Sequence, residues 1–486
     1  MTDKNSLKQV KIGFAPTRRN IFSATAAIEF ANKTRKKLDE LGVNYVDIKD
    51  VNDDGLLYDD EGLEKITKKF KEANIDGLFI ANENFGTEYE VARLAAKFNV
   101  PVLLWGPRDE APAPDGSRRR DTQCGLFAIG KVLRHFNVPF TYIRNSDIDD
   151  PSFSRGVIDF IKVCNVVKTF RNTRVLQIGP RPFDFWSVIV NEGELLEKFG
   201  IQLSPIPLGE VTSYMNDLIK KNDPRIDETK DTFRKWADIK IKDEDFTKVA
   251  ALKLAMQDKM KEYGCNCGTI QCWTELQREI GILPYASEAL LQTEGMPVTC
   301  ETDINGAISE VLAESATLGD ERALFADVNC RHPENENGEL LQHLGTFAFQ
   351  TAKNRPVLPP SHFVFDYPGS AAFQVKDGTY TLVRFDGDHG KYSMLIGNAK
   401  TCDGPYEQGT YAWFQFKDLN RFEAKYVYGP YIHHMAGVRS DVVPILAEAG
   451  KYINVKPDYF DPIKDKVAAY WYGDLDTILD DDQNNN

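Results

Sequence analysis

Short apolar runs alternate with helix-like stretches through the first two thirds of the chain, and this alternation limits the fold most. The stretches Ile21–Leu41 and Leu63–Phe70 carry apolar residues at helical spacing. Strands that alternate with helices predict a parallel sheet joined by crossover helices. A second unit of this kind begins near Arg174 with RVLQIG. The strands expected in the first unit are Val10–Pro16, Asn44–Ile48, Gly77–Ala81 and Pro101–Trp105.

The pattern changes after about Arg355. The segments HFVFDYPG, TYTLVRFD, YSMLIGNAKT and TYAWFQFKDL are short alternating runs separated by Gly, Asn and Asp, which is typical of antiparallel strands. We therefore expect an α/β fold with two Rossmann- or flavodoxin-like parallel-sheet domains and an antiparallel β-rich C-terminal domain. The expected boundaries are 1–170, 171–354 and 355–486, and 486 residues suffice for three domains.

Composition excludes several classes of protein. The net charge of −14 repels nucleic acid and anionic membranes, so neither is an expected partner. No apolar stretch is long enough to span a bilayer, and the first residues lack the apolar core of a signal peptide. The eight cysteines form no CxxC pair and are expected to be reduced thiols. These features predict a cytoplasmic protein. The motifs GxGxxG, GxxxxGK[ST] and GxSxG are absent, so nothing indicates a nucleotide cofactor or a serine hydrolase.

Two acids and a set of histidines carry the chemical signal. Glu301 follows the apolar run GMPVTC, and Asp327 follows ALFA, with a helix-like segment between them. One βαβ crossover of this length is expected to place both acids at the same edge of one sheet, on neighbouring strands. Two carboxylates that converge there can bind a divalent cation or share acid–base work. The alternative is that each is a solvated loop acid, or that Asp327 caps a turn.

Six of the seven histidines follow residue 330. His343 lies in ELLQHLGTF, and His433 and His434 form a pair in GPYIHHMAG. Imidazole and carboxylate together suit Mn²⁺, Co²⁺ or Fe²⁺ as well as Mg²⁺. The alternative for each histidine is a surface position or a hydrogen-bonded place in the core.

The segment QCWTELQREIGILPYASEALLQTEGMPVTCETDINGAIS, from Gln271 to Ser309, resembles the L-fucose/L-arabinose isomerase family, as do FADVN, ELLQHLG and GPYIHH further on. The resemblance implies that Glu301, Asp327 and His434 bind a divalent metal. His343 is similar to a ligand that the arabinose enzymes add, and His433 is the reserve for His434, with a place in the substrate site. Gln271 resembles a substrate-contacting glutamine of the family.

The resemblance also implies the activity. We expect a Mn²⁺-dependent aldose–ketose isomerase, with Co²⁺ or Mg²⁺ as alternative metals, acting on a monosaccharide through a cis-enediol. Glu301 and Asp327 would move the proton between C2 and C1. The family further implies a homotrimer or homohexamer with shared active sites. The alternatives are a cytosolic sugar-binding or sensing protein on the same scaffold, or a metal-dependent epimerase or aldolase.

Further residues are candidates for contacts to the sugar. Trp105 and Trp273 offer rings that a sugar can stack on, although burial in the core is the alternative for both. Asn84 is a polar residue directly after a strand, where a turn residue is also common. Arg18 and Arg19 follow the first strand. If these arginines line the pocket rather than face solvent, the sugar carries an anionic group such as a sulfonate or phosphate at C6. A deoxy sugar is the other candidate substrate.

Overall fold

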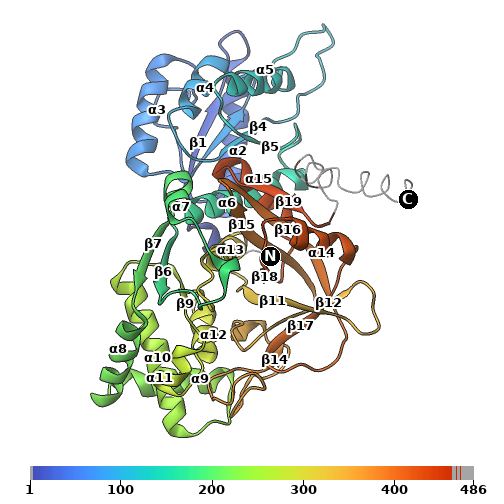
Figure 1. Cartoon of the computed structure of the whole chain (residues 1–486). Coiled ribbons are helices and arrows are strands. Elements are labelled where there is room, and N and C mark those ends of the chain that lie inside the picture. Colours follow the sequence, from blue (N-terminus) through green and yellow to red (C-terminus); the bar gives the residue numbers. More distant parts are fainter. Residues whose placement is uncertain (1–3, 462–466, 468–470, 472–486) are drawn as a thin grey trace. The chain divides into compact units, whose positions relative to one another are not determined.

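The computed structural model describes residues 4–461, 467 and 471, and the chain divides into two compact units (Figure 1). Of the described residues, unit 1 comprises 4–168, 444–454, 467 and 471. Unit 2 comprises residues 169–443 and 455–461. The described helices include none that is long and apolar enough to cross a membrane.

Unit 1 is built on a parallel sheet with the strand order β2-β1-β3-β4-β5, which confirms the predicted parallel sheet. This order, with its reversal at β1, is that of flavodoxin-like folds. Before the sheet comes the short helix α1 (Lys4–Leu7). The strands are β1 (Ile12–Thr17), β2 (Tyr45–Val46), β3 (Gly77–Asn82), β4 (Val102–Trp105) and β5 (Thr141–Tyr142).

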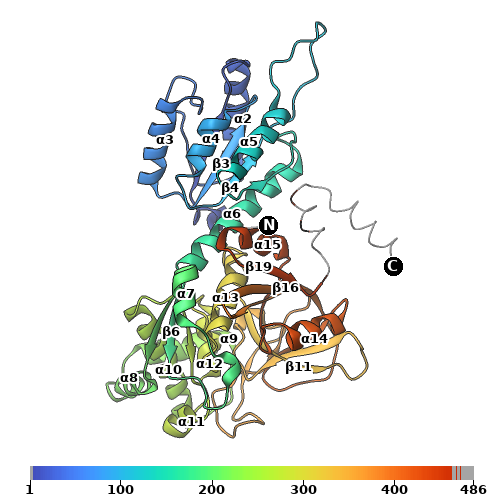
Figure 2. The ribbon, with the colours of Figure 1, turned by 45° about the horizontal axis from the view of Figure 1, so that its top comes forward.

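Helices cover both faces of this sheet (Figure 2). The apolar sides of α3, α4 and α5 share one core with the strands. On the other face, Phe160 and Cys164 of α6 pack closely against Gly77 of β3, where a side chain would collide with the Cys164 sulfur. The helices of the unit are α2 (Ala24–Leu41), α3 (Asp60–Ala73), α4 (Glu88–Ala95), α5 (Thr122–His135), α6 (Pro151–Arg171, whose last residues belong to unit 2) and α15 (Val443–Ile453).

Unit 2 begins with a second parallel sheet, of order β10-β9-β6-β7, which the sequence also predicted. Its strands are β6 (Arg174–Ile178), β7 (Gln202–Ile206), β9 (Cys267–Ile270) and β10 (Val298–Thr299). A separate short pair joins β8 (Asp238–Ile239) to β13 (Val357–Leu358). The helices here are α7 (Glu192–Phe199), α8 (Leu208–Lys220), α9 (Arg225–Trp236), α10 (Asp243–Glu262), α11 (Glu275–Ile280), α12 (Tyr285–Thr293) and α13 (Ile304–Ser315).

The rest of unit 2 is a mainly antiparallel sheet of order β14-β17-β12-β11-β18-β15-β16-β19. Because β16 also pairs with β17, the strands from β17 round to β16 close into a barrel, and the predicted β-rich C-terminal domain is confirmed. The strands are β11 (Leu324–Arg331), β12 (Gly338–His343), β14 (Phe373–Gln374), β15 (Thr379–Asp388), β16 (Lys391–Cys402), β17 (Thr410–Gln415), β18 (His434–Val438) and β19 (Lys456–Tyr459); helix α14 is Leu419–Tyr428.

Helix α13 lies between the parallel sheet and the barrel. It packs against β9 on one side and against β15 and β18 on the other, and every residue from Ile304 to Ser315 is buried. The segment before this helix, which carries Glu301 and Asp303, is therefore brought next to the barrel strands that carry Asp327 and His434.

Candidate metal centre

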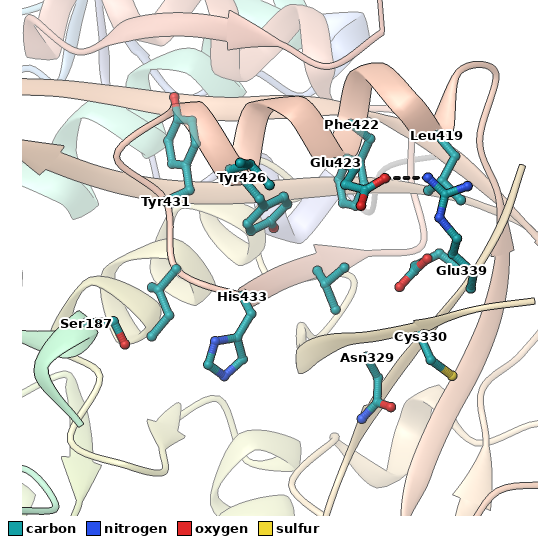
Figure 3. A pocket seen from close by; sticks show the side chains of 14 residues that line it. Ser187, Asn329, Cys330, Glu339, Leu419, Phe422, Glu423, Tyr426, Tyr431 and His433 are labelled. Atoms are coloured by element: carbon teal, nitrogen blue, oxygen red, sulfur yellow. Dashed lines mark hydrogen bonds and ion pairs between the residues drawn. The ribbon is translucent and has the colours of Figure 1, made fainter. Parts of the chain in front are cut away.

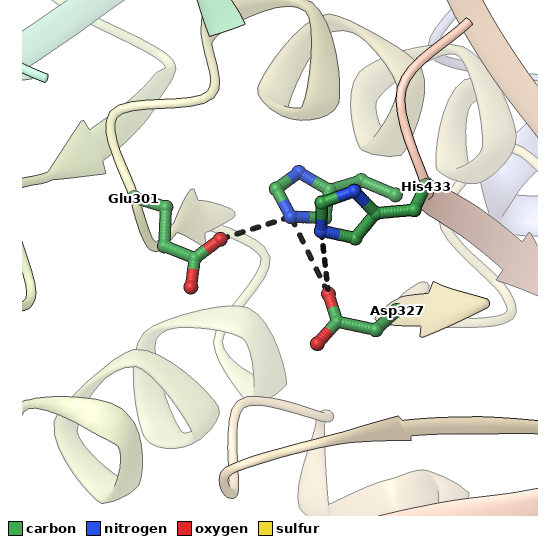
Figure 4. A group of neighbouring side chains, drawn as sticks. Glu301, Asp327 and His433 are labelled. Atoms are coloured by element: carbon green, nitrogen blue, oxygen red, sulfur yellow. Dashed lines mark ion pairs between the residues drawn. The ribbon is translucent and has the colours of Figure 1, made fainter. Parts of the chain in front are cut away.

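A cavity of about 580 Å³ in unit 2 has His433 in its lining (Figure 3). At His433, four side chains converge, namely Glu301, Asp327, His433 and His434 (Figure 4). One potential ligand atom from each lies within 4.8 Å of all the others. Asp327 of β11 stands directly opposite His434 of β18 in the antiparallel register.

The two acids come from different sheets. Glu301 follows β10 of the parallel sheet, whereas Asp327 lies within β11 of the barrel. The expectation that they sit on neighbouring strands of one sheet is therefore wrong. The segment between them does form a helix, α13, but the chain leaves it for the barrel instead of returning to the parallel sheet.

Glu301 and Thr302 both adopt the left-handed backbone conformation, with φ of 62° and 56°. Residues other than glycine rarely do so, and such strain persists where surrounding bonds impose it. Here the Thr302 N–H donates to the Ile270 carbonyl at 3.2 Å, and its hydroxyl donates to the Pro180 carbonyl at 3.1 Å. The Glu301 N–H donates to the Cys272 sulfur at 3.3 Å. Strained backbone of this kind concentrates at functional sites.

A chain of buried charges fixes the ring of His434. Its Nδ1 lies 2.7 Å from Asp303 Oδ2, so Nδ1 donates and Nε2 faces the cluster. Asp303 also accepts from the Gly306 N–H at 2.9 Å, at the start of α13, and pairs with Arg384. Arg384 in turn pairs with Asp386 at 2.7 Å. Asp303, Arg384 and Asp386 are all buried, so neighbouring groups rather than solvent hold the imidazole in place.

The buried atoms that face the centre fit a divalent metal. His434 Nε2 lies 2.9 Å from Glu301 Oε2 and 3.3 Å from Asp327 Oδ1. All three atoms are buried, and none has a hydrogen bond of good geometry among the described residues. Buried polar atoms are nearly always bonded, so three unsatisfied acceptors that face one another indicate a shared cation. Their nitrogen and oxygen donors are the set expected for Mn²⁺, Co²⁺ or Mg²⁺.

The buried ionisable groups at this centre shift one another's pKa values strongly. Burial opposes a proton on His434, but the neighbouring carboxylates of Asp303 and Glu301 raise its pKa to about 10. Burial alone would raise the pKa of Glu301, but the charges of His434 and His343 and the hydrogen bond from Trp273 lower it to about 2. Burial and the neighbouring carboxylates raise the pKa of Asp327 to about 7, against the effect of His434. The two carboxylates therefore favour a positive charge in the space between them.

His343 lies next to this group but outside it. The ring is buried, with Nε2 3.9 Å from Asp327 Oδ1 and 3.0 Å from the Cys300 sulfur. Nδ1 accepts the Leu344 N–H at 2.8 Å, and burial lowers the His343 pKa to about 4, so the neutral ring carries its proton on Nε2. A metal would need a lone pair at Nε2, so ligation by His343 stays a prediction that requires the other tautomer.

His433 forms the outer side of the centre, and Trp273 contacts one of its carboxylates. The side chain of His433 is half exposed, its Nε2 lies 3.9 Å from Asp327 Oδ1, and its ring stacks on Phe185 with the centroids 5.7 Å apart. The Trp273 indole N–H donates to Glu301 Oε1 at 3.1 Å, which leaves Oε2 toward the cluster. Gln271 directly follows β9, and its side chain lies against Gly179.

Asp303, Arg384 and Phe185 were not predicted as site residues. A signal existed for two of them. Asp303 stands where a helix N-cap is expected, just before the helix-like segment, and Arg384 interrupts the apolar strand TYTLVRFD, which indicates a buried ion pair.

The remaining predicted substrate residues lie in unit 1. Arg18 pairs with Asp54 at 2.7 Å, and its side chain is 11% exposed. Asn84 is buried and its side chain accepts the backbone N–H of Arg19 at 2.8 Å, so it organises its own loop. Trp105 is fully buried and donates to the Ser146 hydroxyl at 3.2 Å, which leaves neither face of the indole open to a sugar. Contacts of Arg18 and Asn84 with a sugar stay predictions.

Several known proteins are similar to this chain in sequence. Residues 13–171 match the family model for the N-terminal domain of fucose/sulfoquinovose isomerase. The sulfoquinovose isomerase of Priestia aryabhattai is 23% identical over 406 residues, which cover 82% of this chain and 88% of that protein. The sulfoquinovose isomerase of Alkalicoccus urumqiensis is 22% identical over 362 residues, 74% of this chain and 80% of that protein.

The match of the N-terminal family model and these similarities support a fucose isomerase-like family and indicate an aldose–ketose isomerase, in agreement with the resemblance seen in the sequence. Within that class, the relatives it matches here are sulfoquinovose isomerases, including one from Clostridium sp. strain MSTE9 that is 23% identical over 291 residues, 57% of this chain and 61% of that protein.

Proposed function

We propose that this chain is a divalent-metal-dependent isomerase that interconverts an aldohexose bearing a sulfonate at C6 and the corresponding ketose. The similarity to sulfoquinovose isomerases supports the reaction and the anionic sugar. The observation that carries the metal dependence is the meeting of three buried, unsatisfied ligand atoms, on Glu301, Asp327 and His434.

Glu301, Asp327 and His434 would hold the metal, with His433 at the solvent side and His343 as a further candidate. Mn²⁺ is the metal we propose, with Co²⁺ and Mg²⁺ as alternatives, because the donor set accepts all three. When bound, the metal supplies positive charge that stabilises the negative charge developing on the sugar oxygens during enolisation.

The residues of the chain supply the proton transfer. Isomerisation removes the proton on C2 and places a proton on C1 of a planar cis-enediol. Glu301 and Asp327 reach the centre from different sheets and flank His434 (Figure 4), so one carboxylate can take the proton and the other can return it. Trp273 fixes one oxygen of Glu301, and the buried pair of Asp303 with Arg384 keeps His434 in a single orientation.

We further propose that the protein acts in the cytoplasm as a homotrimer or homohexamer with shared active sites, an assembly that the family resemblance supports. Sedimentation of the purified protein tests this directly: a trimer or hexamer is expected, and a monomer at working concentrations contradicts it.

The function is tested by incubating the Mn²⁺-loaded protein with 6-deoxy-6-sulfoglucose and following the products by ¹³C NMR. We expect ketose signals that disappear after chelation and return with Mn²⁺. Formation of a 2-epimeric aldose instead would indicate an epimerase, and binding without conversion would indicate a sensing protein. Conversion that continues unchanged in a metal-stripped protein would refute the metal dependence.

A further inference from the structure

The cavity beside the metal centre extends away from the ligands. It lies within unit 2, between the outer half of β11, the start of β12 and helix α14, and His433 belongs both to its lining and to the metal cluster (Figure 3). Its volume of about 580 Å³ is within the range of small-molecule sites. A sugar with C1 and C2 at the metal centre can therefore place the rest of its carbon chain in this cavity.

The lining offers polar groups that suit sugar hydroxyls. The Tyr426 hydroxyl is buried and has no hydrogen-bond partner among the described residues. Glu339 is 7% exposed, and burial raises the pKa of its carboxyl to about 7 against the charge of Arg331. Asn329, two residues beyond Asp327 on the same strand, adds an amide. Each of these three groups, a hydroxyl, a carboxyl and an amide, can donate and accept hydrogen bonds. Sugar hydroxyls need partners of this kind because they also donate and accept.

One cation stands among these groups. Arg331 is the only arginine or lysine among the described residues that line the cavity. Its guanidinium pairs with Glu423 of α14 and donates to Asn420 Oδ1 at 3.0 Å. The side chains of Arg331 and Glu423 are 44% and 57% exposed. An exposed ion pair contributes about 0–1 kcal/mol, so a ligand anion can replace Glu423 at little cost.

The position of Arg331 matches the length of the substrate. Arg331 and the metal-centre residue Asp327 lie four positions apart on β11. At about 3.3 Å per residue their Cα atoms are separated by at most roughly 13 Å, and the bulge between Val328 and Cys330 shortens this. Two side chains and a six-carbon chain together bridge such a distance.

We propose that this cavity is the subsite for the distal end of the sugar and that Arg331 binds the C6 sulfonate. The inference rests on the proposed function. A guanidinium presents paired N–H donors that suit an oxyanion. Without substrate, the Glu423 carboxylate forms an ion pair with the Arg331 guanidinium. This pairing keeps the Arg331 charge neutralised beside the buried Glu339 and reduces its attraction for other anions.

The test compares Arg331→Gln with the parent protein, both loaded with Mn²⁺, using 6-deoxy-6-sulfoglucose and glucose as substrates. Loss of a charged hydrogen bond predicts a KM for the sulfonated sugar about 10- to 100-fold higher. The parameters for glucose should not change. Glu423→Gln should lower the KM for the sulfonated sugar at low salt, because it frees Arg331. Binding of the two corresponding sugar alcohols by calorimetry gives the same comparison without turnover.

Arg421→Gln is the matched control. Arg421 lies on α14, as Glu423 does, and is exposed, but it donates to the Tyr459 carbonyl at 3.2 Å and does not line the cavity, so we expect no change in KM. An unchanged KM in Arg331→Gln, or an equal rise in KM for both sugars, overturns the inference. If Arg18→Gln instead raises the KM for the sulfonated sugar alone, the sulfonate binds in unit 1. If the parent protein does not convert the sulfonated sugar, the proposed function itself fails.

Discussion

Replacing Asp303 with Asn should weaken metal binding although none of the four clustered side chains changes. The Asn carbonyl can still accept the Gly306 N–H, which is 2.9 Å from Asp303 Oδ1. The amide nitrogen then takes the place of Oδ2, 2.7 Å from His434 Nδ1. An amide N–H donates, so the imidazole must turn its lone pair to Nδ1 and carry its proton on Nε2, the atom that faces Glu301. The opposite amide orientation would set the nitrogen against the Gly306 N–H, whereas the Arg384 guanidinium donates to both oxygens of Asp303 and opposes an amide nitrogen in either place.

The expected magnitude follows from the role of Asp303 behind a ligand. Removing the partner of a metal-binding histidine typically lowers metal affinity 10- to 100-fold, which is about 1.4–2.7 kcal/mol. The substitution also takes one of two carboxylates from the buried Arg384, at a cost to stability of about 1–3 kcal/mol. Binding and stability must therefore be measured separately.

The assay is calorimetric titration of the metal-free protein with Mn²⁺, with thermal unfolding measured alongside. Asp386→Asn is the control, because it removes the other carboxylate of Arg384 and leaves the bond between Asp303 and His434 in place. We expect both variants to lose stability and only Asp303→Asn to lose affinity. Equal Mn²⁺ affinity in the two variants would refute the proposed role of Asp303.

Four further substitutions test other parts of the account. Glu301→Gln should abolish isomerisation and leave the circular dichroism spectrum unchanged, and normal turnover would contradict the assignment. His434→Ala should lose bound Mn²⁺ in elemental analysis, whereas His343→Ala should retain it, since Nδ1 of His343 is occupied by the Leu344 N–H; loss in both would make His343 a ligand. Burial raises the pKa of Glu83 in unit 1 to about 8 from 4.5, so between these values the unfolded chain releases a proton that the folded chain keeps, and stability falls as pH rises, by at most about 1.4 kcal/mol per pH unit. Glu83→Gln should make the fall of the melting temperature between pH 5 and 8 less steep, because it removes this contribution, and an unchanged slope would contradict the argument.

Much of the fold was readable from local patterns. Parallel strands buried on both faces appear as short apolar runs, and barrel strands appear as alternating ones, so both kinds of sheet could be predicted. The pairing between strands could not. The spacing of Glu301 and Asp327 fits a crossover within one sheet, yet β11 pairs with β18, about a hundred residues further on. Sequence spacing does not show which of two available sheets a strand will join.

The same limit applies to the site. Glu301, Asp327 and His434 could be proposed because the two acids follow apolar runs and all three lie within motifs that resemble the isomerase family. The choice between His433 and His434 depends on the register that sets Asp327 opposite His434. The bond between Asp303 and Arg384 joins residues 81 positions apart, and no local pattern predicts their pairing. Trp105 was a candidate for sugar stacking, but a tryptophan inside a buried strand and one beside a ligand look alike in sequence.

The central claim is that Glu301, Asp327 and His434 share one cation. Crystals soaked in Mn²⁺ and measured for anomalous scattering test it directly. The account predicts a peak about 2 Å from Glu301 Oε2, Asp327 Oδ1 and His434 Nε2. A peak bound by other residues, or no peak at saturating Mn²⁺, would contradict it.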